Sequence, residues 1–284
     1  MIELDGATFL VQWAAGGWVF LWVTTRRREV GLGYGWLQRG VFLALGAGSL
    51  VAAFLTTPTW PREIATMAFL AAGLVALVVS VVRKTAGVAG QRDVVERRSA
   101  RVAAMTGIDR DEQRFDASAA EFPPGLDLIA AGLGMVAVVI ASIEAAGPVG
   151  LSVARGVVSA VFLGSVTDGM LLGHWYLVQP GLARGPLLEL VKWTGILWLP
   201  HVILFLWPTG MVSVLNGDID DAYNGLLGWF WVACTVATIV LVGVTRAALR
   251  EREYSAVMAA TGLLYLAILT AFGQDLVARV LLAP

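Results

Sequence analysis

The stretch 157–181, VVSAVFLGSVTDGMLLGHWYLVQPG, is the most informative part of this chain, because a long apolar run in it ends in a polar and aromatic cluster. Asp168 is the only charged residue between positions 157 and 173. An apolar run of about 20 residues matches the hydrocarbon thickness of a bilayer and predicts a membrane-spanning helix. Because an ionisable residue inside such a helix is costly, it marks a candidate functional site.

The composition of the whole chain agrees with a membrane location. Hydrophobic residues make up 58% of the 284 residues and charged residues 14%, and the mean hydropathy is +0.76. Soluble domains contain about a quarter charged residues. The net charge of −1 provides no basic surface for nucleic acid, so no nucleic-acid partner is expected. Cys234 is the only cysteine, which excludes a disulfide within the chain and CxxC metal sites.

Apolar blocks recur along the chain and predict an all-α fold, a polytopic transmembrane bundle of about eight helices forming a single domain over 1–284. The expected spans are 7–25, 36–56, 64–82, 126–145, 155–178, 186–206, 225–245 and 255–272. The longest polar segment, 83–125, is a predicted connector. Within it, 91–105 has the pattern of a helix lying on the membrane surface, and a solvated connector with no role of its own is the alternative.

The basic residues predict the orientation, since cytoplasmic loops are enriched in lysine and arginine. With the first loop in the cytoplasm, 17 of the 20 basic residues fall on the cytoplasmic side, and Arg62, Arg155 and Arg279 remain outside. The connector 83–125 is then cytoplasmic and both termini face the outside. The expected location is a bacterial-type inner (plasma) membrane, crossed several times.

Two rows of small residues at every fourth position predict close helix packing. One row is Gly40, Ala44, Gly48 and Ala52, and the other is Gly156, Ala160 and Gly164, which continues to Asp168. Packing within the bundle is the simpler interpretation, and contact with another subunit is the alternative.

The candidate ligand-binding residues lie in the hairpin of the spans 155–178 and 186–206. They are Thr167, Asp168, His174, Trp175, Tyr176, Glu189 and Lys192. Lys192 lies about as deep in its span as Asp168 does, and Glu189 lies near the level of His174. Two pairs are therefore predicted, Asp168 with Lys192 and Glu189 with His174, since pairing reduces the cost of burying charge. A regular helix turns Asp168 and His174 in different directions, so these two are not expected to touch.

Two ligand classes suit this hairpin. A quinone head would accept hydrogen bonds from His174 or Tyr176 with Trp175 against its ring, and a lipid headgroup would use the same donors. The alternative is an interfacial belt of aromatic residues with Lys192 extended to the surface. A bis-histidine haem is not expected, because His174 and His201 lie about 20 Å apart along the membrane normal. No covalent cofactor and no metal site are predicted.

The sequence favours an integral membrane subunit of a larger, redox or energy-transducing complex, with a quinone or lipid site at the cytoplasmic end of this hairpin. Membrane lipids and other membrane subunits are the expected partners. The alternative is a proton- or ion-coupled transporter that uses Asp168 as its titrating group. A lipid-modifying enzyme ranks last, because no nucleophile motif or metal-binding acid cluster occurs, and no catalytic residue is assigned.

Overall fold

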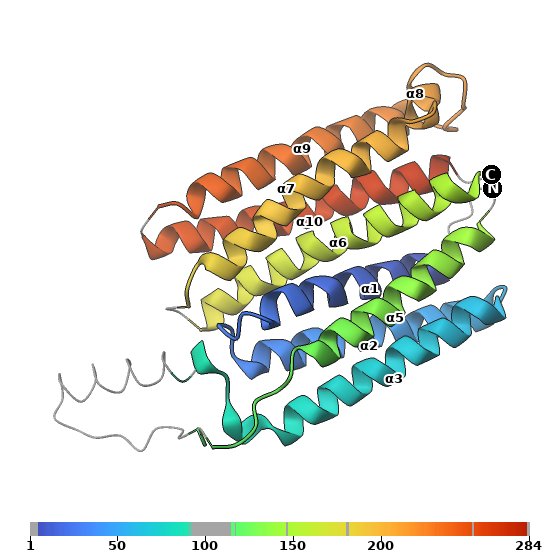
Figure 1. Ribbon diagram of the computed structural model, residues 1–284. Helices are drawn as coiled ribbons and strands as arrows, with labels where there is room; N and C mark the ends of the chain where they lie inside the picture. The colour runs from blue at the N-terminus through green and yellow to red at the C-terminus, as the bar shows by residue number, and fades with distance from the viewer. Residues whose placement is uncertain are drawn as a thin grey trace.

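The computed structural model describes residues 5–90, 92, 115–116, 118–145, 147–179, 182–251 and 253–282. Eight helices in this part of the chain are long and apolar enough to cross a membrane (Figure 1). They are α1 (Gly6–Thr25), α2 (Leu32–Leu55), α3 (Trp60–Val82), α5 (Gly125–Glu144), α6 (Val149–Val178), α7 (Gly185–Leu206), α9 (Leu226–Ala248) and α10 (Tyr254–Leu281). The short elements are η1 (Lys84–Ala86) and α8 (Gly210–Leu215).

The predicted all-α polytopic bundle is confirmed, and the differences concern helix ends. The helix α2 begins at Leu32 instead of 36, and α6 begins at Val149, directly after Pro148, instead of at 155. Pro148 is the N-cap of α6, and its carbonyl oxygen accepts hydrogen bonds from the N–H groups of Leu151 and Ser152 in the first turn. The helix predicted at 91–105 lies outside the described residues, apart from residue 92.

The spans form two groups of four that follow one another in the chain. In the first half, α1, α2, α3 and α5 pack in a closed ring, each against the next and α5 back against α1. In the second half, α6, α7, α9 and α10 form a ring with the same connectivity. The first helices of the two rings, α1 and α6, pack against each other and join the halves. The fold is thus two four-helix rings side by side.

The contact between α1 and α6 is close because glycine lies on both sides of it. A Cβ atom built on Gly16 would lie 1.7 Å from the carbonyl oxygen of Ala160, and one on Gly164 would lie 2.1 Å from the backbone of Gly16. The row Gly156–Ala160–Gly164 therefore packs within the bundle, as the simpler interpretation predicted. The row in α2 differs, because Gly40 and Ala44 are exposed and nothing lies within 4 Å of a Cβ built on Gly40.

We name the two ends of the bundle by what lies there. Both ends of the described chain, Asp5 and Leu282, lie at one end, called the termini end (Figure 1). The opposite end, called the connector end, includes the loops from α1 to α2 and from α6 to α7, and the start of the segment between α3 and α5. The assignment of the connector end to the cytoplasm stays a prediction.

Candidate functional site

Asp168 is fully buried, but it faces the first half of the molecule instead of α7. Its Oδ1 accepts a hydrogen bond of 3.2 Å from the hydroxyl of Tyr34, at the start of α2. Its Oδ2 is buried and has no hydrogen-bond partner in the described part of the chain. Gln38, one turn after Tyr34, is also fully buried, and its amide lies beside the Tyr34 hydroxyl.

The two predicted pairs in the hairpin of α6 and α7 are wrong. Lys192 is exposed, and no ion pair joins it to Asp168 among the described residues. Glu189 binds two arginines of the loop after α1, with 2.8 Å from Arg26 Nη2 and 2.5 Å from Arg27 Nε. Matched depth on two helices does not fix the directions in which their side chains point, and those directions separate both pairs.

The remaining predicted residues have local partners. His174 is exposed, with its Nδ1 3.2 Å from the hydroxyl of Tyr265, and it does not touch Asp168, as expected. Thr167 Oγ1 accepts a hydrogen bond of 3.0 Å from the indole N–H of Trp13. The indole N–H of Trp175 donates to Gln179 at 3.1 Å. The Tyr176 hydroxyl donates to the carbonyl oxygen of Ala183. None of these contacts tests whether a quinone or a lipid binds to this cluster, so that use of the cluster stays a prediction.

A buried ion pair that the sequence analysis missed lies beside this region. Arg39 of α2 binds Asp127 of α5 through two hydrogen bonds, Nε to Oδ1 at 2.8 Å and Nη2 to Oδ2 at 2.7 Å. Ser80 accepts a hydrogen bond of 3.1 Å from the same guanidinium, and the ring of Phe122 lies 4.2 Å from its centre. Since Arg39 is fully paired within the first half, it has a structural role.

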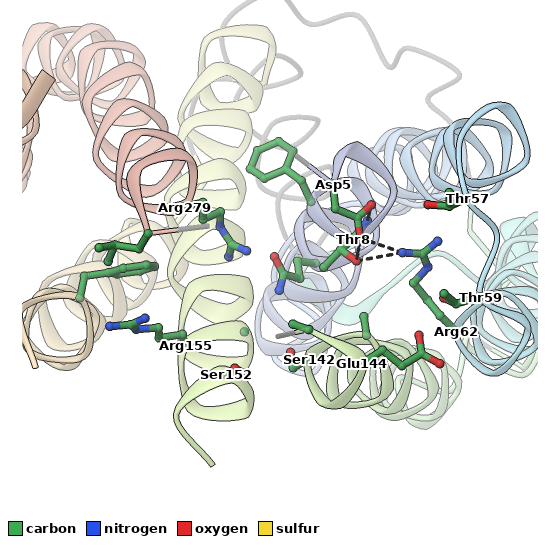
Figure 2. Close-up of a pocket in the computed structure, with 17 residues that line it drawn as sticks. Asp5, Thr8, Thr57, Thr59, Arg62, Ser142, Glu144, Ser152, Arg155 and Arg279 are labelled. Carbon is green, nitrogen blue, oxygen red and sulfur yellow. Dashed lines mark hydrogen bonds and ion pairs between the residues drawn. The ribbon is translucent and has the colours of Figure 1, made fainter. Parts of the chain in front are cut away.

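The termini end contains a cavity of about 360 Å³, the size of a small-molecule site (Figure 2). It lies between the two halves, because α1, α3 and α5 line it from one side and α6, α7 and α10 from the other. Its lining combines charged groups with apolar surface from Phe9, Phe205 and Leu282. A cavity of this kind suits a ligand with a charged head and an apolar part.

Three arginines line the cavity, one from each of three distant helices: Arg62 of α3, Arg155 of α6 and Arg279 of α10. They are also the basic residues that the orientation analysis places outside. Figure 2 shows Arg155 and Arg279 on one side of the view, and Arg62 with Asp5, Thr8 and Glu144 on the other. The charge bias of the sequence sets these three arginines apart from the other basic residues, but nothing in the sequence showed that three positions so far apart would converge.

The three arginines differ in how far their charge is neutralised. Arg62 is paired with two acids, Asp5 at 2.8 Å and Glu63 at 2.7 Å. Asp5 is placed for this by its role as the N-cap of α1, where its other oxygen accepts from backbone N–H groups. Arg155 has no acidic partner among the described residues; it donates to the carbonyl oxygens of Leu204 and Trp207, at 2.9 and 3.1 Å.

Arg279 is held in the cavity by a chain of buried polar groups. Its Nε donates to Asp275 Oδ2 at 2.5 Å, and Asp275 Oδ1 lies 3.0 Å from Nε2 of His201. The other ring nitrogen of His201 lies 3.1 Å from the amide nitrogen of Gln274. Both ring nitrogens of His201 therefore have partners on α10.

Three buried polar atoms of residues in the cavity lining have no hydrogen-bond partner within the described residues. They are Nη2 of Arg279, a donor, Oε1 of Gln12, an acceptor, and the hydroxyl Oγ1 of Thr59, which can do either. Because buried polar groups are nearly always hydrogen-bonded, such atoms indicate where a ligand or water binds. The described residues include no group of three or more histidine, cysteine, aspartate or glutamate side chains that could hold a metal ion.

Comparisons of the chain with protein-family models, with curated proteins and with solved structures find no match. What the chain can bind must therefore be argued from its own geometry. Its class is clear from the helices alone: it is a polytopic membrane protein with eight helices, among the described residues, that can cross a bilayer.

Proposed function

We propose that this membrane protein binds an amphipathic anion in the cavity at the termini end. The observation that supports the proposal is the convergence of Arg62, Arg155 and Arg279 on one cavity. In the predicted orientation they are the three basic residues left outside, whereas the other 17 of the 20 lie on the cytoplasmic side. If these arginines served only as surface charges, nothing would bring three distant positions to the same cavity.

The groups around the cavity suggest how the ligand is held. Arg155 supplies a positive charge without an acidic partner in the described chain, and Arg279 supplies a free Nη2 donor; together they suit a carboxylate, phosphate or sulfonate head. Gln12 Oε1 would accept a hydrogen bond from a hydroxyl or amine of the ligand. Phe9, Phe205 and Leu282 would contact its apolar part.

This proposal keeps the lipid that the sequence predicted as one possible ligand and changes the place where it binds. A lipid with an anionic headgroup has the required chemistry, and so does a free acid with an apolar tail. A quinone lacks the negative charge that the arginines select. Two sequence-based predictions stand beside this proposal: that the protein is a subunit of a larger redox or energy-transducing complex, and that it lies in a bacterial-type inner membrane.

Binding of hexanesulfonate to the protein in phosphatidylcholine nanodiscs tests the proposal by calorimetry, with empty nanodiscs as the reference. Hexanesulfonate keeps its charge over the accessible pH range. We expect saturable binding, and Arg155→Gln should weaken it about 10- to 100-fold, since a charge-assisted hydrogen bond contributes about 1.5–3 kcal/mol. Lys192→Gln removes one positive charge far from the cavity and should leave the affinity unchanged.

Two further arms identify the source of the head group. Methanesulfonate, which has the head without the tail, should bind more weakly. Phosphatidylglycerol in the nanodisc should compete with hexanesulfonate if a lipid headgroup is the natural occupant, and should not if the natural ligand is a free acid. Equal affinities of the Arg155→Gln and the unaltered protein would contradict the proposal.

A further inference from the structure

The arrangement of the two halves bears on what happens to a bound ligand. Each half is a ring of four helices, and the connectivity of the rings is the same. Both halves start at the same end of the bundle, because an even number of spans precedes α6. In transporters built from two such repeats, the substrate site lies between the repeats, and the halves rock about it. The cavity at the termini end lies at this interface.

Ion pairs and hydrogen bonds join the halves at the connector end. Arg26 and Arg27, which follow α1, bind Glu189 of α7 at 2.8 and 2.5 Å. Tyr34 of α2 donates to Asp168 of α6, and its ring packs against Trp175 at 6.1 Å between centroids. These groups close the interface at this end, and we call them the connector-end gate.

The termini end of the same interface is built differently. The ion pairs beside the cavity stay within one half: Arg62 with Asp5 and Glu63 in the first, and Arg279 with Asp275 in the second. Ion pairs therefore join the halves at the connector end, whereas at the termini end the halves meet around the cavity through contacts such as those of Phe9 and Trp13 with Phe272. Between the two ends, Gly16 and Gly164 bring α1 and α6 into backbone contact, which supplies a pivot.

The gate also contains buried polar groups. Asp168 Oδ2 has no hydrogen-bond partner within the described structure, and the fully buried amide of Gln38 lies beside the Tyr34 hydroxyl. Burying an unpartnered polar atom costs free energy. Opening of the gate would expose both groups to water or to a passing ligand, as expected for the lining of a closed passage.

We infer that the protein carries its amphipathic anion across the membrane by alternating access, and that the structure is the state open at the termini end. The inference rests on the proposed binding of an anion in the cavity. In this cycle the anion enters between the halves beside Arg155 and Arg279. The halves then rock about the contact of α1 with α6, the bonds of Glu189 and Asp168 across the interface break, and the anion leaves past Gln38 at the connector end.

Uptake of radiolabelled hexanesulfonate into proteoliposomes, down its own gradient, tests transport. We expect saturable uptake above protein-free vesicles, and a loss of that uptake in Arg155→Gln. If the protein binds hexanesulfonate in nanodiscs but moves none of it, transport is wrong and the binding proposal stands. If it does not bind at all, both are wrong.

The labelling rate of a single cysteine measures opening of the connector-end gate. In a Cys234→Ala background, Thr24→Cys places a thiol beside Tyr34, at a position that is 1% exposed in the closed gate. Its labelling by N-ethylmaleimide should be slow, and hexanesulfonate should accelerate it, because the protein passes through a state with an open gate each time it releases the anion at the connector end.

Glu189→Gln should accelerate the same labelling about five-fold, because it removes the ion pairs that favour the closed gate. Glu251→Gln, the same change on an exposed residue of the connector end, is the matched control and should have no effect. If neither hexanesulfonate nor Glu189→Gln changes the labelling rate of Thr24→Cys, the inference that this end of the interface opens as a gate is wrong.

Discussion

The buried pair Arg39–Asp127 gives a stability prediction whose size follows from its geometry. The two side chains are 1% and 0% exposed, and two charge-assisted hydrogen bonds join them. In Asp127→Asn one of those bonds is replaced by an amide N–H that faces the guanidinium N–H, and the arginine charge stays buried without a counter-charge. We expect a loss of about 3–5 kcal/mol in the free energy of unfolding.

The assay is equilibrium unfolding in mixed micelles with increasing sodium dodecyl sulfate, followed by circular dichroism. The double variant Arg39→Met with Asp127→Leu should be more stable than Asp127→Asn, since removing both charges costs less than leaving one unpaired. Glu189→Gln is the control, because its arginine partners are 39% and 40% exposed and such pairs contribute about 0–1 kcal/mol. A loss below about 1 kcal/mol in Asp127→Asn would refute the reasoning.

Three other predictions concern packing, a loop and topology. Gly16→Val should cost about 1–3 kcal/mol by forcing α1 away from Ala160, whereas Gly40→Val, which meets no atom within 4 Å, should be neutral in the same assay. Burial acts to raise the pKa of the Asp221 carboxyl, but the backbone N–H groups of Gly225, Tyr223, Gly228 and Leu227 hold it below its usual range. Asp221 therefore stabilises the fold above the unfolded-chain pKa of about 3.9 and loses this effect as the pH falls through its folded pKa, so the loss of Tm in Asp221→Ala should be largest near neutral pH and should shrink as the pH is lowered. Thiols at Glu251→Cys and Asp218→Cys should be labelled from opposite sides of the membrane, with Glu251→Cys cytoplasmic, and labelling from one side would contradict the span assignment.

The spans could be predicted from the sequence because bilayer thickness fixes the length of an apolar block, whatever the block packs against. The hydrogen-bond partner of Asp168 could not be predicted from the sequence. Depth along a helix follows from residue counting, but the direction of a side chain depends on how the helix is rotated against its neighbours. Tyr34, the observed partner, also lies before the predicted start of its span, since α2 extends beyond its apolar block to Leu32.

The cavity shows a second limit of sequence analysis. Arg62, Arg155 and Arg279 stood out in the sequence only as the minority in the charge bias. Their convergence results from the ring-like packing of two sets of four helices, which no local pattern encodes. The contact of Asp275 with His201 follows the same rule, because these two residues are 74 positions apart.

Thiol labelling in the cavity tests the central claim, that the termini end selects an anion, most directly. Ser152 lines the cavity and is half-buried, and Ser152→Cys in the Cys234→Ala background places a thiol beside Arg155. The anionic reagent 2-sulfonatoethyl methanethiosulfonate should react faster than its trimethylammonium analogue, relative to their rates on free cysteine, and hexanesulfonate should protect the thiol. A faster reaction with the cationic reagent, or no protection by hexanesulfonate, would contradict an anion site in this cavity.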